Sequence, residues 1–391
     1  MKRGLADLDV KGRRVFVRAD FNVPLDGSAI RDDSRIKGSL PTIRDLRDRG
    51  ARVVLASHLG RPRGALRPEL SLAPVAERLG QCLGASVPLA PDSVGPEVER
   101  LTRELVDGEV LLLENVRFHP GEEANDPVHV RALARLADFY VNDAFGTAHR
   151  AHASTTGLAH ALPAAAGQLM LAELQALDPI VKGPPRPFAA IVGGAKIGDK
   201  IALLERLAAT ADVLILGGAM ANTFLAADGA DIGRSRAESA SDAVARIRSA
   251  AIASGCRLVL PVDAVVANEL AADASASTVA LDAVPSESMI LDIGPASLAA
   301  YAEALASART VLWNGPVGVY ELAPFAGGTL GLARLLADSP AQVVVAGGDA
   351  VAAAQASGRA GDFAHLSTGG GATLELIEGR ELPGVAALPE G

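Results

Sequence analysis

Cysteine is scarce in this sequence. Cys82 and Cys256 are the only two among 391 residues, and they lie in different halves of the chain. Isolated cysteines of this kind are more typical of small buried side chains than of a disulfide framework or a catalytic thiol. This scarcity favours a reducing compartment, and we expect a cytoplasmic protein.

Positive charge is also in deficit, because 37 Lys and Arg residues face 46 Asp and Glu residues and leave a net charge of −9. Together with an isoelectric point near 5.4, this balance argues against nucleic acid or an anionic membrane as the main partner. An anionic small molecule remains open as a ligand, since it needs only a local cluster of cations.

Long apolar segments are missing as well. No window approaches the ~18 uninterrupted, strongly apolar residues of a membrane-spanning helix. The first residues, MKRGLADLDVKGRRVFVRAD, include basic side chains but lack the apolar core of a signal peptide. We therefore expect neither a membrane span nor a signal peptide.

Short runs rich in Val, Ile and Leu recur along the whole chain, each followed by a polar or glycine-bearing turn and a segment of helical period. Such runs lie at 14–20, 52–60, 110–119, 138–146, 188–196, 213–220, 257–265, 289–295, 310–318 and 341–350. Continuous apolar runs are typical of parallel strands that helices cover on both faces. The length of 391 residues suits two such α/β domains.

A break in this rhythm falls near 160–187, where a helix-like stretch is followed by a proline-rich turn. We place the domain boundary there, with Met170–Leu177 as a connecting helix. In open parallel sheets, ligands bind outside the carboxyl ends of the strands. The residues that directly follow each run are therefore the candidates for binding and catalysis.

In the first half of the chain, the predicted strands end in cationic and polar residues. These are Arg18, Asp20, Asn22, His58, Arg61, Arg117, His119, His149, Arg150 and His152, with Arg35 opening a helical segment beyond the first strand. An ordinary solvated charge is the simplest interpretation of any one of them. Together, they predict a site where guanidinium groups bind a small, multiply anionic, hydroxylated ligand. A metal site is disfavoured here, because neighbouring guanidinium groups repel a divalent ion.

In the second half, the predicted strands end in glycine-rich turns such as GGAK, GGAM, NGPVG and GGDA. Glycine lets backbone N–H groups approach a ligand closely. Lys196 and Lys200 stand one turn apart at a predicted helix start, and Gly369–Gly371 forms a further turn of this kind. These features predict a site for nucleotide phosphates, while the absence of G-x-G-x-x-G disfavours a dinucleotide site.

Carboxylates also follow predicted strands in this half. Asp349, in AGGDA, is the one most readily interpreted as a Mg²⁺ ligand, since Mg²⁺ favours one or two carboxylates together with phosphate oxygens. For Asp263 and Asp292, a structural or capping role is at least as well supported.

Nine segments together resemble one family. They are VRADFNVPL, SRIKGSLPTI, SHLGRP, LLLENVRFHPGEE, NDAFGTAHRAHAST, GGAKIGDKI, WNGPVGVYE, GGD and HLSTGGGATLELIEG. In this order, and over essentially the whole chain, they are similar to the phosphoglycerate kinases. The resemblance implies reversible phosphoryl transfer between 1,3-bisphosphoglycerate and ADP, giving 3-phosphoglycerate and MgATP.

The resemblance also implies two similar-sized α/β domains that face each other across a cleft, usually in a monomer. Residues 1–169 would bind phosphoglycerate, 170–187 would form the connecting hinge, 188–379 would bind nucleotide, and the tail 380–391 would return to the first domain. Phosphoglycerate binding is carried over to Asp20, Asn22, Arg35, His58, Arg61, Arg117 and Arg150. Nucleotide binding is carried over to Lys196, Lys200, Gly217, Gly218, Asn314, Glu321, Gly347, Gly348, Asp349 and Ala350, with Asp349 also holding the metal.

One position departs from the family pattern. After GGD the family commonly has a threonine, and this chain has Ala350. A hydroxyl that could contact the nucleotide phosphates is therefore missing, although the backbone N–H remains.

The chemistry that the resemblance implies needs no general base. In the reverse direction the acceptor is a carboxylate, which is ionised at neutral pH because reference carboxyl pKa values lie near ~4. What remains is to position the moving phosphoryl group and neutralise its charge, which we assign to Arg35, Lys196 and the amides of Gly370 and Gly371. We also expect a hinge closure that brings the two ligands together.

Two other classes of protein compete with this interpretation. A non-catalytic nucleotide- or sugar-phosphate-binding module could have kept the same fold, but it would be expected to have lost Arg35, Lys196 or Asp349. A nicotinamide-dependent dehydrogenase is disfavoured by the missing glycine fingerprint.

Overall fold

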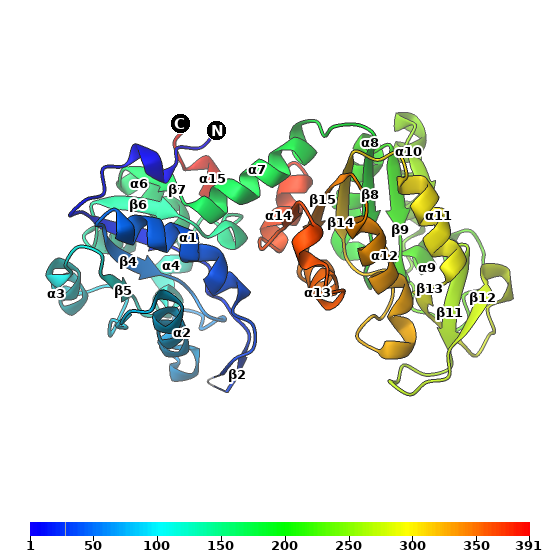
Figure 1. Ribbon diagram of the computed structural model, residues 1–391, viewed down its shortest axis with the longest axis horizontal. Coiled ribbons are helices and arrows are strands. Elements are labelled where there is room, and N and C mark those ends of the chain that lie inside the picture. Colours follow the sequence, from blue (N-terminus) through cyan, green and yellow to red (C-terminus); the bar gives the residue numbers. More distant parts are fainter. Residues whose placement is uncertain (28) are drawn as a thin grey trace. The chain divides into compact units, whose positions relative to one another are not determined.

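The computed structural model describes residues 1–27 and 29–391. They form two compact units, one made of Met1–Gln175 and Glu381–Gly391 and the other of Ala176–Arg380. The chain therefore passes between the units twice, once within helix α7 (Gln168–Lys182) and once at the start of the tail. The two ends of the chain lie side by side in the first unit (Figure 1), where Lys2 and Glu390 form an antiparallel β-bridge.

The first unit is built on a five-stranded sheet in which every strand is parallel to its neighbours. Its order is β5 (Val110–Leu112), β4 (Arg52–Ala56), β1 (Arg14–Arg18), β6 (Phe139–Asn142) and β7 (Ala164–Ala166). A separate two-stranded antiparallel ribbon pairs β2 (Leu25–Asp26) with β3 (Ala29–Ile30). The helices are α1 (Ser34–Asp48), α2 (Ala73–Leu83), α3 (Pro96–Glu104), α4 (Pro120–Glu123), α5 (Pro127–Ala134), α6 (Leu158–Ala161) and α15 (Pro383–Ala386).

Both faces of this sheet are buried, which explains the continuous apolar runs. Val15 and Val17 of β1 share one core cluster with apolar residues of α1 and α2. Phe16 points to the opposite face, where it lies near Tyr140, and the Tyr140 hydroxyl donates to the Ser154 carbonyl at 2.9 Å. Strands buried on both sides lose the alternation of polar and apolar residues that a half-exposed strand shows.

The second unit contains a six-stranded sheet, again parallel throughout. Its order is β10 (Arg257–Val259), β9 (Val213–Leu216), β8 (Phe188–Val192), β14 (Thr310–Asn314), β15 (Gln342–Ala346) and β16 (His365–Leu366). Its helices are α8 (Ile201–Thr210), α9 (Gly218–Ala227), α10 (Ser241–Ser254), α11 (Pro295–Leu305), α12 (Gly327–Ala337), α13 (Gly348–Ala356) and α14 (Gly371–Ile377).

Helices α11, α12 and α13 cover one face of this sheet. Trp313 of β14 lies in a core cluster with Tyr301 of α11, Leu332 of α12 and Ala353 of α13. The neighbouring residue Leu312, which points the other way along the strand, is also fully buried. The predicted α/β class, with parallel sheets flanked by helices, is therefore confirmed.

The run at 289–295 and the second part of the run at 257–265 are not the parallel strands that the sequence predicted, whereas the first part of the latter run is the parallel strand β10. The runs at 257–265 and 289–295 contribute β11 (Asp263–Ala267) and β13 (Met289–Ile293) to a small antiparallel sheet with β12 (Ser277–Ala280). The prediction was wrong because this sheet is covered on both faces by small clusters, one around Val266 and one around Phe325. Burial on both faces makes an apolar run continuous whatever the direction of its neighbours.

The short strands β7, β12 and β16 had no counterpart among the predicted runs. The structure also lengthens the predicted connecting helix Met170–Leu177 to Gln168–Lys182. Its N-terminus is anchored in the first unit, because Thr42 Oγ1 accepts from the Gln168 amide at 2.8 Å and Asp143 Oδ1 accepts from the Leu169 amide at 2.9 Å.

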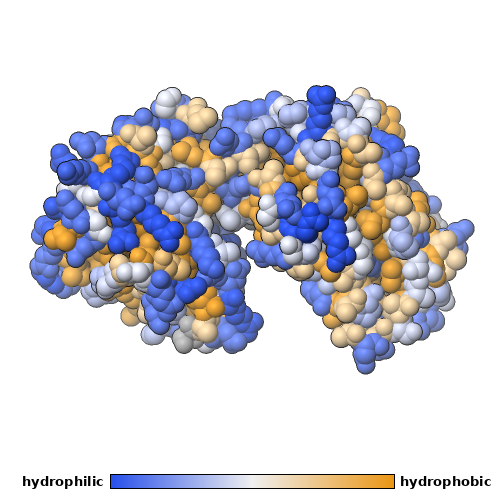
Figure 2. Space-filling view, in the orientation of Figure 1, coloured by the Kyte–Doolittle hydropathy of each residue, from blue (hydrophilic) through white to orange (hydrophobic). Residues whose placement is uncertain are grey.

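Hydrophilic and hydrophobic residues are interspersed on the face that Figure 2 draws, in both units. Within residues 1–27 and 29–391, no helix has the length and apolar character needed to cross a bilayer.

The buried carboxyl of Asp143 leads us to predict that the free energy of unfolding falls as pH rises. Burial raises the pKa of this carboxyl to about 7, against an ordinary value of 3.8 in the unfolded chain. Its contribution to stability is therefore complete below about pH 4, is lost as pH rises through about 7, and is constant above that. Asp143→Asn keeps the shape and removes the titration. Compared with this variant, the parent chain should lose roughly 1–3 kcal/mol of unfolding free energy between about pH 5 and about pH 8.

The measurement is urea unfolding at both pH values, with the exposed Asp9→Asn as the matched control. If the parent and Asp143→Asn respond to pH in the same way, Asp143 is ionised in the folded chain and the prediction is wrong.

Candidate functional site

Each parallel sheet has a point where the strand order reverses. In the first unit, β1 is flanked by β4 on one side and by β6 on the other, and in the second unit β8 is flanked by β9 and β14. Chain segments that leave such neighbouring strands turn in opposite directions, so a crevice opens at their carboxyl ends. The candidate residues that follow β1, β8 and β14 therefore surround these two crevices.

Arginine side chains gather around His58 in the first unit. The positive charges of Arg18, Arg35, Arg117 and Arg150 all act on the His58 ring, and together with its burial they hold its pKa well below the usual range. His58 is thus a neutral ring within a group of guanidinium ions. The structure brings four of the five predicted arginines into one electrostatic cluster, including Arg18, which was not among the residues carried over as phosphoglycerate ligands.

Asp20 and Asn22 orient neighbouring groups in this cluster. Asp20 Oδ2 accepts from Arg35 Nη1 at 2.7 Å, so the half-buried Arg35 side chain is fixed at the start of α1. Asn22 Oδ1 accepts from the Gly60 amide at 2.9 Å and holds the loop between His58 and Arg61. Arg61 itself is exposed.

Arg18 is a residue whose role the sequence left undefined. Its side chain is fully buried at the end of β1, where Nε donates to Ser154 Oγ at 2.8 Å and Nη2 lies 3.2 Å from His58 Nδ1. A guanidinium can only donate, so His58 Nδ1 is the acceptor and the ring carries its proton on Nε2. Arg18 is a positioning residue, and its location at the end of an apolar run was the available signal.

A buried acid, Glu122, lies close to Arg18 and shares Ser154 with it. Glu122 is fully buried and accepts from Ser154 twice, at 3.0 Å from the amide and 2.6 Å from the hydroxyl. Burial raises the pKa of Glu122, while the nearby Arg18 charge and the Ser154 hydrogen bonds oppose this rise. A buried charge of this kind is tolerated only when it is paired and hydrogen-bonded.

Arg117 and Arg150 complete the cluster. Arg117 is 3% exposed, Nη1 donates to the Gly60 carbonyl at 3.0 Å, and Nε lies 3.3 Å from Glu123. Burial, followed by the charges of Arg18 and Arg150, lowers the pKa of Arg117 to about 10, so it stays protonated at neutral pH. Four like charges in one place are most stable when an anion binds among them.

The histidines at the strand ends are not the cations that the sequence suggested. Burial and then the neighbouring arginines lower the pKa of His152 to about 3, so it is neutral like His58. His119 lies outside the cluster, with Nε2 2.6 Å from Asp92 and its ring stacked on His129. The positive charge of this site therefore comes from arginine.

In the second unit, glycines let two loops touch at the switch point. A side chain at Gly193 would place its Cβ 2.0 Å from the Pro316 carbonyl oxygen, and one at Gly315 would lie 2.4 Å from the Gly193 oxygen. Gly218 has a φ of 64° and would bring a Cβ to 3.0 Å from the Gly194 oxygen, while Gly217 would collide with Val317. The glycines predicted from GGAK, GGAM and NGPVG are thus required by close backbone approach.

Lys200 lies among these loops, whereas Lys196 is exposed. Lys200 Nζ donates to the Gly193 carbonyl at 2.9 Å, and burial lowers its pKa to about 8 against the opposing charges of Asp349 and Asp199. The two lysines do not stand one turn apart at the start of a helix, as the sequence predicted, because Lys200 ends a short 3-10 turn, Gly198–Lys200, and α8 begins only at Ile201.

The turn after β15 presents further predicted residues. Gly347 has a φ of 88°, and a Cβ there would lie 2.7 Å from Asn314 Nδ2, which donates to the Ala346 carbonyl at 2.7 Å. Asn314 Oδ1 is buried and has no hydrogen-bond partner in the described chain, so it is available as an acceptor. Gly348 and Asp349 are exposed in the first turn of α13.

Ala350 points away from this turn. It is 1% exposed and belongs to the core cluster beneath the sheet, with Trp313 and Ala353. The turn therefore presents backbone amides and the Asp349 carboxylate. At the position where the family commonly has a threonine hydroxyl, this chain has the buried methyl group of Ala350.

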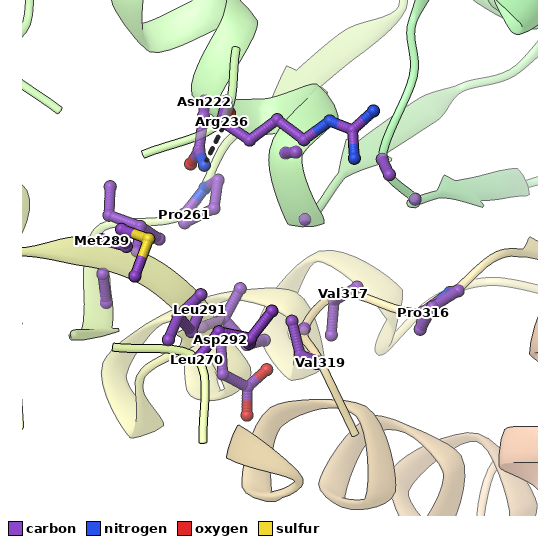
Figure 3. Close-up of a pocket in the computed structure, with 18 of the residues that line it drawn as sticks. Asn222, Arg236, Pro261, Leu270, Met289, Leu291, Asp292, Pro316, Val317 and Val319 are labelled. Carbon is purple, nitrogen blue, oxygen red and sulfur yellow. Dashed lines mark hydrogen bonds between the residues drawn. The ribbon is translucent and has the colours of Figure 1, made fainter. Parts of the chain in front are cut away.

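A cavity of about 360 Å³ opens beside these loops, wholly within the second unit. Gly194, Gly218, Glu321 and Asp349 are among its lining residues, together with apolar residues of β13 and of the loop after β14. Figure 3 shows Leu291, Val317 and Val319 on one side of this space. An apolar cavity with a few polar groups at its rim is typical of a small-molecule site.

Asp263 and Asp292 also line the cavity, but both carboxylates accept hydrogen bonds from backbone amides of the fold. Asp263 accepts from the Ala296 and Ser297 amides at 2.9 and 2.7 Å and so caps α11. Asp292 accepts from the Gly328 amide at 2.6 Å near the start of α12. Asp263 begins a strand rather than following one.

The residues at the rim fit Mg²⁺ only together with a phosphorylated ligand. In the part of the chain that the structure describes, no group of three or more His, Cys, Asp or Glu side chains is arranged to hold a metal ion. The exposed carboxylate of Asp349 is a hard oxygen donor beside the glycine turn. Mg²⁺ commonly binds through one such carboxylate, water and ligand phosphates, and Asp349 suits that arrangement.

The last predicted turn precedes α14. Gly370 has a φ of 53° and a ψ of −116°, a conformation that favours glycine, and Gly371 is exposed at the first position of the helix. A Cβ built at either residue would meet no atom within 4 Å, so there is open space beside this turn. Ser367 and Thr373 share a 2.6 Å hydrogen bond beneath the turn.

The fold defines the class of the chain as an α/β protein of two units, each with a parallel sheet between helices. The family profile described as phosphoglycerate kinase matches residues 5–380. A phosphoglycerate kinase of Moorella thermoacetica is 53% identical over 390 residues, covering 100% of this chain and 99% of the relative. One of Roseiflexus castenholzii is 51% identical over 390 residues, with 99% of each chain covered.

Solved structures agree with these sequence matches. Phosphoglycerate kinase from Coxiella burnetii superposes with a TM-score of 0.90 at 42% identity, over 99% of this chain and 98% of that chain. The enzyme from Pyrococcus horikoshii gives 0.85 at 34% identity, with the same coverage. The chain therefore belongs to the phosphoglycerate kinase family, and the resemblance seen in the sequence is confirmed.

The hypothesis that Lys200 binds nucleotide phosphates predicts how nucleotide affinity depends on pH. Its protonated form attracts phosphates, and with a pKa of about 8 the free chain loses this charge as pH rises. Affinity for MgADP should fall between about pH 7 and about pH 9, by up to roughly tenfold per pH unit above the pKa. Lys200→Met should bind more weakly at pH 7 and lack most of this decline.

Titration calorimetry with MgADP measures both quantities, and Lys182→Met, an exposed lysine on α7, is the control. An unchanged pH profile in Lys200→Met would contradict the assignment of the titrating group.

Proposed function

We infer that this chain catalyses the reversible, Mg²⁺-dependent transfer of a phosphoryl group between 1,3-bisphosphoglycerate and ADP, giving 3-phosphoglycerate and ATP. The observation that carries this inference is the group of arginines around the neutral His58, in a chain of this family. Such a group suits a small ligand with both a phosphate and a carboxylate. The reaction belongs to glycolysis and gluconeogenesis.

Phosphoglycerate is proposed to bind to the first unit through Asp20, Asn22, Arg35, His58, Arg61, Arg117 and Arg150. Arg117 is buried and stays protonated at neutral pH, and Arg150 is half-buried, which suits both side chains to the non-transferred phosphate. His58 would donate from Nε2 to a ligand oxygen, because Nδ1 already accepts from Arg18. Fixed donors of this kind bind an anion without reorganisation.

The nucleotide is proposed to bind to the second unit, with its base in the cavity of about 360 Å³. Gly217 and Gly218 would flank the base and Glu321 would accept from the ribose hydroxyls. Lys196, Lys200, Asn314, Gly347, Gly348, Asp349 and Ala350 would surround the phosphates, Ala350 through its amide alone. The accessible start of α13 adds backbone N–H groups and a favourable helix dipole.

The transfer itself is proposed to depend on charge neutralisation. The acceptor carboxylate of 3-phosphoglycerate is ionised at neutral pH, so no side chain has to remove a proton. His58 is hydrogen-bonded at Nδ1 and low in pKa, which fits a binding role rather than that of a base. Arg35, Lys196 and the amides of Gly370 and Gly371 would stabilise the equatorial oxygens of the moving group.

Mg²⁺, when bound with the nucleotide, would supply positive charge to the β- and γ-phosphate oxygens. Asp349 is the side chain proposed to hold it, and the exposed position of this carboxylate at the first turn of α13 leaves it free to do so.

Because the two ligands are assigned to different units, transfer requires the units to approach each other. The chain crosses between them within α7 and at Arg380–Glu381, so we propose that closure bends these two connections. We further propose a monomer in the cytoplasm that acts on small molecules, without nucleic-acid or membrane partners.

The activity is tested directly with the residues assigned to the transfer. Arg35→Ala and Lys196→Ala should each reduce turnover by on the order of 10²–10³, comparable to the loss of one oxyanion donor. Turnover is measured with 3-phosphoglycerate and MgATP in an assay coupled to the consumption of 1,3-bisphosphoglycerate. His58→Ala and Arg61→Ala should mainly weaken binding of 3-phosphoglycerate.

Arg35→Ala also leaves Asp20 without its 2.7 Å partner, so Arg35→Lys serves as a second variant that keeps the charge but not the planar fork. The exposed Arg103→Ala is the control. Circular dichroism checks folding, and near-normal turnover in folded Arg35→Ala and Lys196→Ala would defeat the assignment. An inactive parent chain that still binds both ligands would instead indicate a binding module.

Closure predicts a ligand-dependent change in dimensions. Adding 3-phosphoglycerate and a non-transferable MgATP analogue together should lower the radius of gyration measured by small-angle X-ray scattering, more than either ligand alone. Closure is expected only when both ligands contribute contacts in the closed state. An unchanged radius with both sites saturated would exclude this part of the proposal.

A further inference from the structure

One residue of the nucleotide cavity has no assigned role. Arg236 is the only Lys, Arg or His among the described residues that line this cavity. It lies on the loop between α9 and α10, a segment without regular secondary structure. Neither the strand-end pattern nor the family motifs in the sequence pointed to it.

The backbone on which Arg236 stands is fixed to α9. Asn222 Nδ2 donates to the Arg236 carbonyl at 3.2 Å, the bond drawn dashed in Figure 3. Two residues later, the Glu238 amide donates to Thr223 Oγ1 at 3.1 Å. Asn222 and Thr223 are both buried on α9, the helix whose first residue, Gly218, lines the same cavity. The position of Arg236 relative to the cavity is therefore set by the fold.

The guanidinium of Arg236 makes no hydrogen bond or ion pair that would stabilise the described part of the fold. On the same loop, Arg234 Nε donates to the Glu287 carbonyl at 2.7 Å, so that side chain joins the loop to the segment just before β13. For Arg236, no side-chain hydrogen bond or ion pair occurs within the described chain. The nearby acids Asp263 and Asp292 accept from backbone amides instead. The backbone of Arg236 is thus fixed beside the cavity while its side chain is exposed and has no partner among the described residues, so the guanidinium is available to a ligand.

The shape of the cavity indicates which part of a ligand Arg236 meets. Figure 3 shows its side chain extending along one side of the space, with Val317 and Val319 on the side across from it. The gap between a guanidinium plane and an apolar wall suits a flat aromatic ring, since a guanidinium stacks on ring faces through cation–π attraction. The phosphates have other partners, because Lys200 lies at the Gly193 loop.

We propose that Arg236 is a base-binding residue that covers one face of the nucleotide base, with the Val317 wall on the other face. This proposal deepens the proposed function, since it assumes that the cavity binds the nucleotide. Arg236 contributes to base affinity through its guanidinium, takes no part in the transfer and does not contact the phosphates.

Arg236→Ala should raise the dissociation constant of ADP by roughly two- to fivefold, the factor that corresponds to an exposed cation–π contact. Adenosine should lose the same factor as ADP, because the lost contact is to the base. Arg236→Met keeps an apolar stem of similar length without the cation and should recover only part of the loss. Titration calorimetry with ADP and with adenosine measures these constants, and Arg206→Ala on the outer face of α8 is the control.

The outcomes separate the alternatives. A loss confined to ADP, with adenosine unaffected, would place the guanidinium on the phosphates and overturn the proposal. Full recovery in Arg236→Met would show that the cation contributes nothing to affinity and would also overturn the proposal.

In the coupled assay, Arg236→Ala should raise KM for ATP and leave kcat and KM for 3-phosphoglycerate unchanged. If the parent chain binds no ADP and has no activity, the proposed function fails, whereas an active parent with unaltered Arg236→Ala refutes only this inference.

Discussion

Both units are built on parallel strands that are buried on both faces, and this constraint decides where polar chemistry can occur. The flanks of such a sheet are filled with aliphatic side chains, as Val15 and Leu312 illustrate. Polar groups are then concentrated at the carboxyl ends, where the strand order reverses beside β1 and β8. The arginine cluster and the glycine loops are two solutions at equivalent places: one concentrates positive charge, and the other brings backbone close to a ligand.

The arginine cluster depends on the guanidinium of Arg18, which is shielded from solvent. Arg18 is fully buried and fixes the tautomer of His58, and it is itself held by Ser154, whose hydroxyl donates to the buried Glu122 at 2.6 Å. Removing the Glu122 carboxyl would leave the Ser154 amide and hydroxyl without their buried acceptor, a change that commonly costs about 1–3 kcal/mol. Arg18, Ser154 and Glu122 thus form a buried hydrogen-bonded chain that holds His58 within the arginine cluster.

The sequence predicted much of this and missed parts for physical reasons. Parallel strands were predictable because burial on both faces leaves continuous apolar runs, but the same signal could not distinguish the antiparallel β11 and β13, whose faces are covered by other clusters. Arginines at strand ends were predictable from chemistry, whereas the neutral state of His152 depends on burial that only the packed structure reveals. Arg236 could not be predicted, because it approaches the cavity through a loop that Asn222 positions by a tertiary hydrogen bond.

The placement of the tail has a consequence for how the protein is made. Residues 381–391 belong to the amino-terminal unit, where the Gly384 amide donates to the Ala148 carbonyl at 2.8 Å and Asn142 Nδ2 donates to Gly384 at 3.2 Å. Domains generally fold in order of synthesis as the chain leaves the ribosome. Here the unit whose synthesis begins first is completed last, because its segment Glu381–Gly391 follows the whole second unit along the chain. The surface that α15 covers therefore stays exposed on the amino-terminal unit until this segment has been made and has left the ribosome.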